Sequence, residues 1–177
     1  MSLTRLLGEV RACQSCLANL PFGARPVLQL ASTARLLIIG QAPGSKVHKS
    51  GILWNDASGN RLRDWLKLDR STFYDAARVA ILPMGFCYPG AGENGSDKPP
   101  QPECAPLWHK PLLRRVPDIR LTLLIGQYAQ RYYLASRRRD SMTSGIFGVR
   151  APILSRCHIQ VGAAQFGCEN ILGSRRL

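Results

Sequence analysis

The sequence predicts a three-layer αβα domain, in which helices cover both faces of a parallel sheet. Three short apolar runs, at residues 35–40, 77–82 and 121–126, are typical of strands buried on both faces. Stretches with helical spacing follow each run, so that strands and helices alternate along the chain. A length of 177 residues with 45% hydrophobic side chains is enough for one domain with its own core.

The chain is predicted to begin with a helix that leads into a loop. Residues 3–17 have apolar positions at helical spacing and end in a Cys-x-x-Cys pair, after which Pro21, Gly23 and Pro26 predict a loop. Further helices are predicted at about 59–68, 104–115 and 127–138. The segment 87–104 is too rich in proline and glycine for an element of its own, and ordered loops of this length are usually functional.

The charge of the chain suggests a polyanionic partner. The 24 Lys and Arg outnumber the 11 Asp and Glu, which gives a formal charge of +13. Cationic side chains release condensed counterions from a phosphate backbone, so DNA is the expected partner, although a solvated basic surface explains the same composition. No stretch approaches the ~18 apolar residues that a membrane span needs. We expect a monomeric, cytoplasmic protein with no membrane partner, and cysteines that serve as thiols or metal ligands.

The turn after the first strand is a candidate ligand-binding site, because ligands of parallel sheets bind beyond the carboxyl ends of the strands. The turn reads Gly40-Gln-Ala-Pro-Gly44. Two glycines and a proline allow the backbone to approach a ligand, and Gln41 offers both a donor and an acceptor. Taken alone, the pattern is equally that of a structural turn.

The residues that follow make the pattern specific. A polar segment leads to Gly51-x-x-Trp54 and then to Ser58-Gly59, which opens a helix. This order resembles the first motif of the uracil-DNA glycosylase superfamily, and above all its iron-sulfur branch, whose turn reads Gly-Glu-Ala-Pro-Gly. The resemblance implies a short, mainly parallel four-stranded sheet, although this chain offers no clear fourth strand.

The resemblance also implies roles for individual residues. The base pocket would be formed by Gly40, Gln41, Ala42, Pro43, Gly44 and Trp54. Trp54 would stack on the flipped base, and Gln41 would help to place the attacking water, with Asp56 as the nearest carboxylate. Contacts to DNA would come from Lys46, His48, Lys49 and Ser58, of which His48 is expected in a loop.

Two of these residues have structural alternatives. A tryptophan such as Trp54 also serves as a packed core residue, because an indole buries a large area and needs a single partner for its N–H. Asp56 precedes a predicted helix by the spacing of an N-cap, which explains its presence equally well.

Four cysteines have a spacing suited to metal binding. Cys13 and Cys16 form a close pair, whereas Cys87 and Cys104 bracket the Pro-rich loop. Four thiolates arranged in this way can hold one [4Fe-4S] cluster or a structural zinc, and isolated reduced thiols remain the alternative. In the iron-sulfur glycosylases the ligands have this layout. The resemblance therefore implies a structural [4Fe-4S] cluster, because base excision is a hydrolysis that transfers no electron.

The chain departs from the superfamily at two places. The second motif, a His-Pro-Ser sequence expected after the helix that ends near residue 138, is absent, and the one histidine of the tail, His158, is followed by neither Pro nor Ser. An asparagine that holds uracil in the iron-sulfur branch should precede Cys87, but residues 81–86 contain none. These departures call uracil specificity and turnover into question.

A change of reading frame explains the missing motif. From Ile153 onward, the frame that begins on the third base of each codon permits Leu-Pro-His-Pro-Ser-x-Arg-Arg-Thr-Ile-Trp-Leu-Arg-Lys. We therefore interpret residues 1–140 as the glycosylase-like domain and 141–177 as an aberrant segment, frameshifted from a point between about 141 and 153. A single-base shift in the nucleotide sequence of the gene would establish this.

The expected function is hydrolysis of the N-glycosidic bond of a flipped deaminated base, with weak or lost activity in this chain. A non-catalytic nucleic-acid binder of the same fold is the alternative. A nucleotide-binding α/β protein fits less well, because the turn has neither the Gly-Lys-Ser/Thr ending of a phosphate loop nor a Gly-x-Gly-x-x-Gly sequence.

Overall fold

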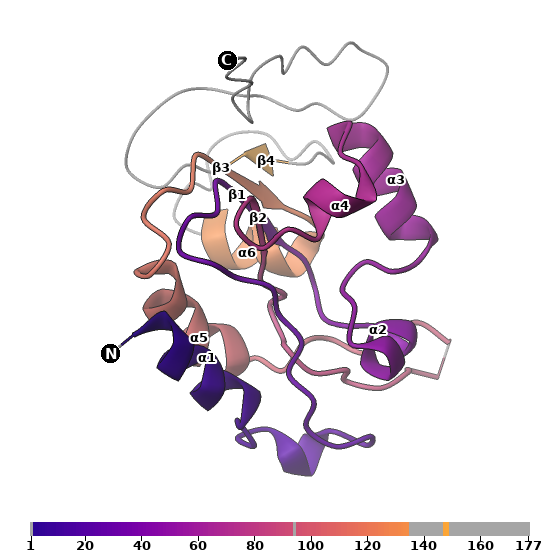
Figure 1. The fold of residues 1–177 in the computed structure, drawn as a ribbon. Coiled ribbons are helices and arrows are strands. Elements are labelled where there is room, and N and C mark those ends of the chain that lie inside the picture. The colour runs from indigo at the N-terminus through magenta and orange to yellow at the C-terminus, as the bar shows by residue number, and fades with distance from the viewer. Residues whose placement is uncertain (1, 94, 135–146, 149–177) are drawn as a thin grey trace, which may run out of the picture.

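The computed structural model describes residues 2–93, 95–134 and 147–148 (Figure 1). It has a mixed α/β fold built on three parallel strands, β1 (Leu36–Ile39), β2 (Val79–Ile81) and β3 (Leu121–Leu124). The three strands lie within the three apolar runs that were predicted as strands. The parallel α/β sheet is therefore confirmed.

The sheet has the strand order β2-β1-β3-β4, in which β4 (Phe147–Gly148) pairs antiparallel with β3. Leu36 is in register with Val79 on one side and with Leu121 on the other. Because β1 lies between its two parallel partners, the chain passes from β1 to β2 on one side and then returns to β3 on the other. The carboxyl end of β1 is therefore at a point where the strand order reverses, which is where ligands bind in such sheets.

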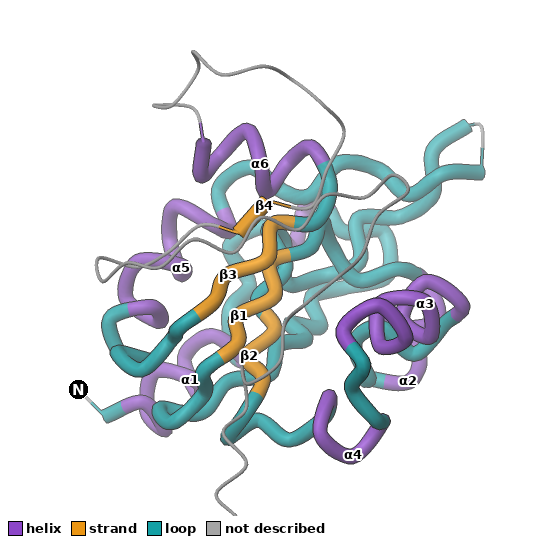
Figure 2. The backbone as a smooth tube through the Cα atoms, turned by 90° about the horizontal axis from the view of Figure 1, so that it is seen from above, coloured by secondary structure: helices purple, strands orange, loops and turns teal. Residues whose placement is uncertain are grey.

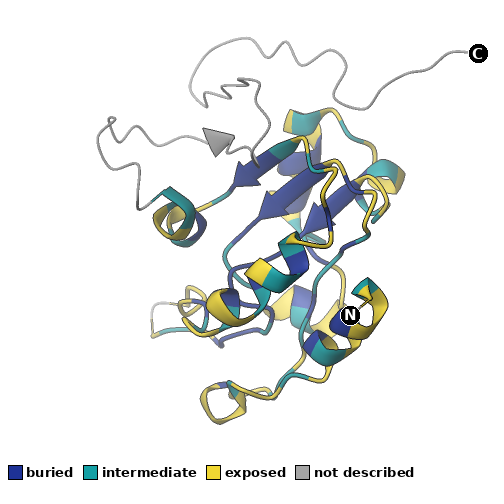
Figure 3. Ribbon diagram, turned by 90° about the vertical axis from the view of Figure 1, so that its left-hand side faces the viewer, coloured by how far each residue is buried: buried dark blue, intermediate teal, exposed yellow. Residues whose placement is uncertain are grey.

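Both faces of the sheet are buried. Alternate residues of β1 belong to different core clusters, Leu37 and Ile39 to one and Leu36 and Ile38 to the other. The first cluster includes buried residues of α1 (Leu3–Arg11), α5 (Cys104–Leu113) and α6 (Gln127–Leu134). The second includes residues of α2 (Ser45–Ser50), α3 (Ala57–Leu66) and α4 (Arg70–Phe73). Figure 2 shows the two groups of helices on opposite sides of the strands, and Figure 3 shows buried strands beneath helices with exposed outer faces.

The helix boundaries differ from the predicted ones. The predicted helix 3–17 ends at Arg11, and the Cys-x-x-Cys pair follows in a turn before a short 3-10 helix, η1 (Leu17–Asn19). The sequence pattern did not predict α2 or α4, because helices of four to six residues are too short to display a periodicity. The helix predicted at 127–138 is described as far as Leu134.

Capping explains several helix starts. The side chains of Ser2, Asp56 and Asp69 accept hydrogen bonds from backbone N–H groups in the first turns of α1, α3 and α4. Among the described residues, no helix is long and apolar enough to cross a membrane.

Candidate functional site

The turn after β1 is tied to the segment that follows β2. The Gly40 carbonyl accepts a hydrogen bond from the Met84 N–H at 2.9 Å, and the Gln41 carbonyl accepts one from the Gly85 N–H at 3.0 Å. Pro43 is buried, whereas Gln41, Ala42 and Gly44 are partly exposed. The turn is thus a braced backbone segment with an accessible surface, as a site that places a ligand requires.

The Trp54 side chain lies directly on this turn. A Cβ atom on Gly40 would come within 3.1 Å of the indole Cζ2 atom, so the ring packs against the glycine backbone. Trp54 is partly exposed and also packs against the core cluster on the side of α2, α3 and α4. The tryptophan therefore combines core packing with a position at the exit of β1, beside Gln41.

The backbone of Trp54 is unusual. Its φ angle is 55°, which is the left-handed region that a bulky side chain rarely adopts. Gly59 accommodates this conformation, since a Cβ atom there would lie 1.7 Å from the Trp54 carbonyl oxygen. Non-glycine residues in this region often occur at functional sites, where the surrounding structure maintains them.

Asp56 acts as a helix cap in the structure. Its Oδ1 atom accepts a hydrogen bond from the Gly59 N–H at 2.8 Å and so begins α3. The structural interpretation of Asp56 is correct, and the catalytic one stays a prediction.

A second carboxylate, Asp97, comes close to the turn. A Cβ atom on Gly44 would lie 3.1 Å from Asp97 Oδ2. Asp97 belongs to the Pro- and Gly-rich loop and forms an antiparallel bridge with Ala91. Burial, followed by the negative charge of Asp97, raises the pKa of the neighbouring Tyr88. Sequence reasoning did not single out Asp97, because 52 residues separate it from Gly44 and no local pattern connects the two.

The predicted DNA-contacting residues lie on helices. Lys46 and Lys49 are exposed on α2, and Ser58 is exposed in the first turn of α3. His48 was expected in a loop, but it lies within α2 and is partly buried. The basic side chains therefore project from elements that directly follow the turn.

His48 is part of an aromatic group with Phe22 and Tyr88. The Phe22 and Tyr88 rings stack at a centroid distance of 5.4 Å, and the His48 ring lies 5.9 Å from Tyr88. Arg25 donates hydrogen bonds to the carbonyl oxygens of His48 and Lys49. These contacts join the loop that follows the first cysteine pair to α2.

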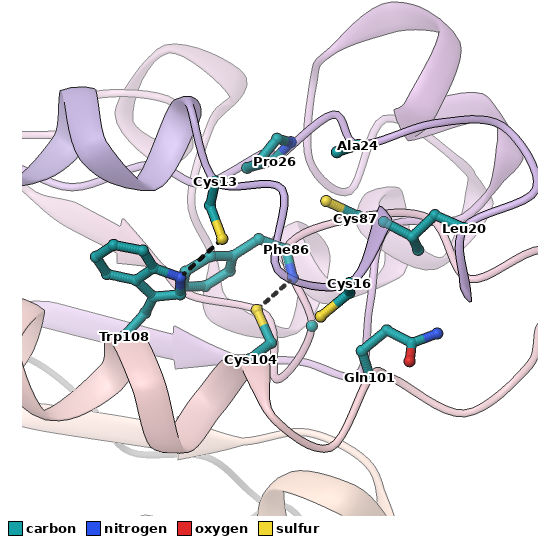
Figure 4. A pocket seen from close by; sticks show the side chains of 11 residues that line it. Cys13, Cys16, Leu20, Ala24, Pro26, Phe86, Cys87, Gln101, Cys104 and Trp108 are labelled. Atoms are coloured by element: carbon teal, nitrogen blue, oxygen red, sulfur yellow. Dashed lines mark hydrogen bonds between the residues drawn. The ribbon is translucent and has the colours of Figure 1, made fainter. Parts of the chain in front are cut away.

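The four predicted cysteines line one pocket. Its walls are otherwise largely apolar, with Leu20, Ala24, Pro26, Phe86 and Trp108 among the lining residues. Figure 4 shows the sulfur atoms of Cys13, Cys16, Cys87 and Cys104 arranged around a common space, although the close pair and the wide pair are far apart in the sequence. The structure thus brings together the close pair and the wide pair that the sequence predicted as one site.

Hydrogen bonds and burial act on these thiols. The Trp108 indole N–H donates to Cys13 Sγ at 3.4 Å, and the Phe86 backbone N–H donates to Cys104 Sγ at 3.4 Å. Burial raises the pKa of Cys104 to about 12 and also raises the pKa of Cys16 and Cys87. Burial acts in the same direction on Cys13, but hydrogen bonds with Ser15 and Trp108 outweigh it and lower the pKa.

The same thiols would repel one another as anions. The charges of Cys13, Cys16 and Cys87 each contribute to the raised pKa of Cys104. Four thiolates in an apolar pocket are therefore stable only with a compensating cationic group. In the part of the chain that the structure describes, no group of three or more His, Cys, Asp or Glu converges closely enough to hold a metal ion.

A family comparison bears on the whole arrangement. The model of the uracil DNA glycosylase superfamily matches residues 29–165, which include the strands, the turn, Trp54 and the Pro-rich loop. The match extends into the segment for which we predict a change of reading frame, so the domain boundary near residue 141 stays a prediction. A strand ending in the braced turn, an aromatic ring on that turn and a match over most of the chain lead to one conclusion: the chain belongs to the uracil-DNA glycosylase superfamily.

Proposed function

We propose that this chain is a uracil-DNA glycosylase-like protein that binds a flipped uracil, or a related deaminated base, stacked on Trp54 and beside the turn 40–44. The observation that carries this proposal is the contact of the Trp54 indole with Gly40 at the carboxyl end of β1. An aromatic face beside an accessible backbone turn suits a planar base, which needs stacking on its face and hydrogen bonds at its edge. Burial of both faces of the sheet supports the three-layer sandwich that this function implies in the superfamily.

The residues would act in sequence. Lys46 and Lys49 would bind phosphates of the strand, and the target nucleotide would rotate out of the base stack onto Trp54. Gln41 would position the water that attacks the sugar carbon as the glycosidic bond breaks. The sugar then carries positive charge and the base leaves as an anion, so both charges need stabilisation.

The two carboxylates near the turn differ in their contacts. Asp56 already accepts a backbone hydrogen bond at the start of α3, whereas Asp97 reaches Gly44 from the Pro-rich loop. Asp56 would assist the attacking water or the cationic sugar, and the proximity of Asp97 to Gly44 supports Asp97 as a second candidate for this role.

The activity of this chain is expected to be weak or lost. The His-Pro-Ser sequence that would stabilise the departing anion is absent, and the region in which it should occur lies outside the described residues. Loss of one hydrogen-bond donor to a developing anion lowers the catalytic rate constant by about two to three orders of magnitude. We propose that the segment 141–177 is a frameshifted product of an ancestral active domain of the iron-sulfur branch.

We propose that the four cysteines hold a structural [4Fe-4S] cluster. Cys13, Cys16, Cys87 and Cys104 would hold it, and the cluster would supply positive charge and four covalent links between the N-terminal turn and the Pro-rich loop. The N–H groups of Phe86 and Trp108 donate to the sulfur atoms, as is typical of thiolate ligands that carry negative charge. Zinc, which needs ligands converging on one point, is the alternative.

A non-catalytic DNA-binding protein is the second candidate function. The charge of +13 and the absence of the second motif favour it. Both functions predict salt-sensitive binding to DNA, and only a glycosylase that retains weak activity predicts an abasic product.

The distinguishing experiment uses oligonucleotides that contain uracil, hypoxanthine or thymine. After incubation with the full chain, alkali cleaves any abasic site, and the fragments are separated by size. Fragments from the uracil or hypoxanthine strand alone support the glycosylase. Intact strands together with salt-sensitive binding would support the DNA-binding alternative, and the absence of binding would overturn both.

A further inference from the structure

The peptide groups around Trp54 are held by a side chain of α3 and by Tyr74, the residue that follows α4. Tyr74 donates a hydrogen bond from its hydroxyl to the Leu53 carbonyl at 2.9 Å. Arg63 donates from Nη1 to the Trp54 carbonyl at 3.2 Å and to the Tyr74 hydroxyl oxygen at 3.2 Å. Two consecutive carbonyls are therefore held by one connected pair of side chains, at the place where the backbone enters and leaves the left-handed conformation.

Arg63 is unusual because it is a buried cation. Its exposed fraction is 7%, and its guanidinium lies 5.3 Å from the centre of the Phe73 ring and 5.6 Å from that of Tyr74. The second nitrogen, Nη2, donates to the Asn60 side chain. Over the described ranges of the chain, the two ion pairs are Arg5–Glu9 and Arg78–Asp75, so Arg63 is compensated by carbonyl oxygens and aromatic faces.

An apolar side chain would fill this space without the cost of burying a charge. An arginine supplies what an apolar residue cannot, which is a planar fork of donors with fixed directions. Here one branch of the fork ends on the Trp54 carbonyl and the other on Asn60, in the turn of helix that also contains Gly59. One hydrogen bond of Arg63 thus ends on the Trp54 carbonyl, and another ends on Tyr74, which holds the preceding carbonyl.

We propose that Arg63 is the positioning residue of Trp54. With Tyr74 and Gly59 it forms a clamp that keeps Trp54 in the left-handed conformation and holds its ring on Gly40. This role depends on the proposed function, in which Trp54 stacks on a flipped base. Its role is to present that ring in one orientation before DNA binds, which lowers the entropic cost of stacking.

The helix offers a matched control. Arg61 lies two residues from Arg63 on α3 but is exposed, and the structure shows no hydrogen bond from its side chain to the backbone of residues 53–54. Replacing Arg61 by alanine removes the same charge from the same helix and leaves the clamp intact.

The test uses the full chain labelled with 5-fluorotryptophan. The sequence contains three tryptophans, so the ¹⁹F NMR spectrum should show three resonances, each assigned by its own Trp→Phe variant. Trp108 lies on α5 and packs in the other core cluster, so its resonance reports whether the fold is intact. The Trp54 resonance reports the orientation and surroundings of the proposed stacking ring.

Arg63→Ala should shift or broaden the Trp54 resonance by more than its linewidth, while the Trp108 resonance keeps its position. Arg61→Ala should leave both unchanged. Should Arg63→Ala fail to fold, Arg63→Lys, which keeps the charge and one donor but loses the fork, should give a smaller shift of Trp54. An unchanged Trp54 resonance in a folded Arg63 variant would overturn the proposal.

A second experiment, with DNA, tests the stacking role of Trp54 separately from the positioning role of Arg63. In the unmodified protein, a uracil-containing single-stranded oligonucleotide should shift the Trp54 resonance, and the thymine-containing strand should not. Arg63→Ala should then weaken the preference for the uracil strand by up to about tenfold, because the Trp54 side chain must become ordered on binding. If the uracil strand never affects Trp54, the stacking role fails, but the ¹⁹F shift in the variants still decides whether Arg63 positions the ring.

Discussion

At the scale of single residues, the pairing of Trp54 with Gly59 shows how one position limits another. The left-handed conformation costs a non-glycine residue about 1–2 kcal/mol, which the surrounding contacts must offset. The conformation brings the Trp54 carbonyl over Gly59, where any side chain would overlap it. Gly59 is therefore required by the backbone of its neighbour rather than by the helix in which it lies.

Gly59→Ala should lower the free energy of unfolding by about 1–3 kcal/mol or more, because the Trp54 peptide must move away from the new methyl group. The matched control is Gly8→Ala. Gly8 is an exposed helical glycine with open space around it, so alanine there should raise the free energy of unfolding by about 0.5–1 kcal/mol. Urea unfolding of both variants measures the difference, and equal effects of the two substitutions would contradict the steric explanation.

A second residue-scale feature is the buried histidine of α5. His109 Nε2 lies 3.0 Å from the Pro83 carbonyl, which can only accept, so Nε2 carries the hydrogen and Nδ1 accepts from the Tyr133 hydroxyl at 2.6 Å. Burial lowers the pKa of His109 to about 4, against the opposing effect of the hydrogen bond with Pro83. The folded protein therefore favours the neutral imidazole.

This lowered pKa predicts a stability that depends on pH. The unfolded chain binds a proton at His109 near pH 6.5, whereas the folded chain does so only near pH 4. The contribution is therefore complete above about pH 6.5 and is lost as the pH falls to about 4, with a total of about 3 kcal/mol. His109→Gln, which does not titrate, should flatten this part of the stability profile measured by urea unfolding. An unchanged slope in the variant would show that other groups cause the acid sensitivity.

At the scale of elements, α3 depends on the cap that Asp56 provides. The carboxylate accepts the Gly59 N–H, and the start of α3 in turn places Arg63 beside Trp54. The Asp56 carboxylate caps α3, and the proposed function gives it a second role in the catalytic step. The two roles can be separated because serine caps a helix but carries no negative charge.

Asp56→Ala should lower the free energy of unfolding by about 1 kcal/mol, and Asp56→Ser should largely restore it. If Asp56 also stabilises the cationic sugar, Asp56→Ser should still lose the abasic-site product from the uracil strand, despite its restored stability. If product formation survives in Asp56→Ser, the catalytic role of Asp56 is wrong. Asp97→Asn, tested beside it, shows whether the carboxylate that reaches Gly44 supplies that role.

At the scale of the whole molecule, the cysteine pocket and the turn are linked through a few backbone groups. The Phe86 N–H donates to Cys104 Sγ, and the adjacent Gly85 N–H donates to the Gln41 carbonyl. The Phe86 carbonyl accepts from Val27 N–H at 2.8 Å, which joins the N-terminal loop to the same segment. A group bound by the four thiols would therefore stabilise the turn 40–44, which we propose as the base-binding site.

Anaerobically purified protein should show the visible absorbance of an iron-sulfur cluster. Alanine at Cys13, Cys16, Cys87 or Cys104 should abolish it. In each variant, amide hydrogen exchange at residues 40–42 and at Gly44 should become faster, because the hydrogen bonds that hold the turn are weakened. Cys157→Ala and Cys168→Ala are the controls, since neither residue belongs to the predicted ligand set, and both should keep the absorbance. A colourless and zinc-free protein would exclude the cluster and the zinc alternative together.

Sequence patterns were sufficient for the parallel α/β sheet and for part of the candidate site. The three apolar runs, the turn 40–44 and the grouping of Cys13, Cys16, Cys87 and Cys104 could be predicted, because each depends on local composition or on a characteristic spacing. The end of α1 at Arg11 and the short helix that contains His48 could not, because tertiary contacts decide the boundaries of such short elements.

The amino-acid sequence by itself determined the fold class, the superfamily resemblance and the residue types available for chemistry, since these follow from hydrophobic period, turn composition and charge. The tertiary structure alone decided that Arg63 and Tyr74 hold the backbone of Trp54, and that Asp97 reaches Gly44. Those contacts depend on specific side-chain directions, which no local pattern specifies. The physical reason is that a buried donor such as Arg63 is placed by the packing of two helices, and this packing exists only once the whole core has formed.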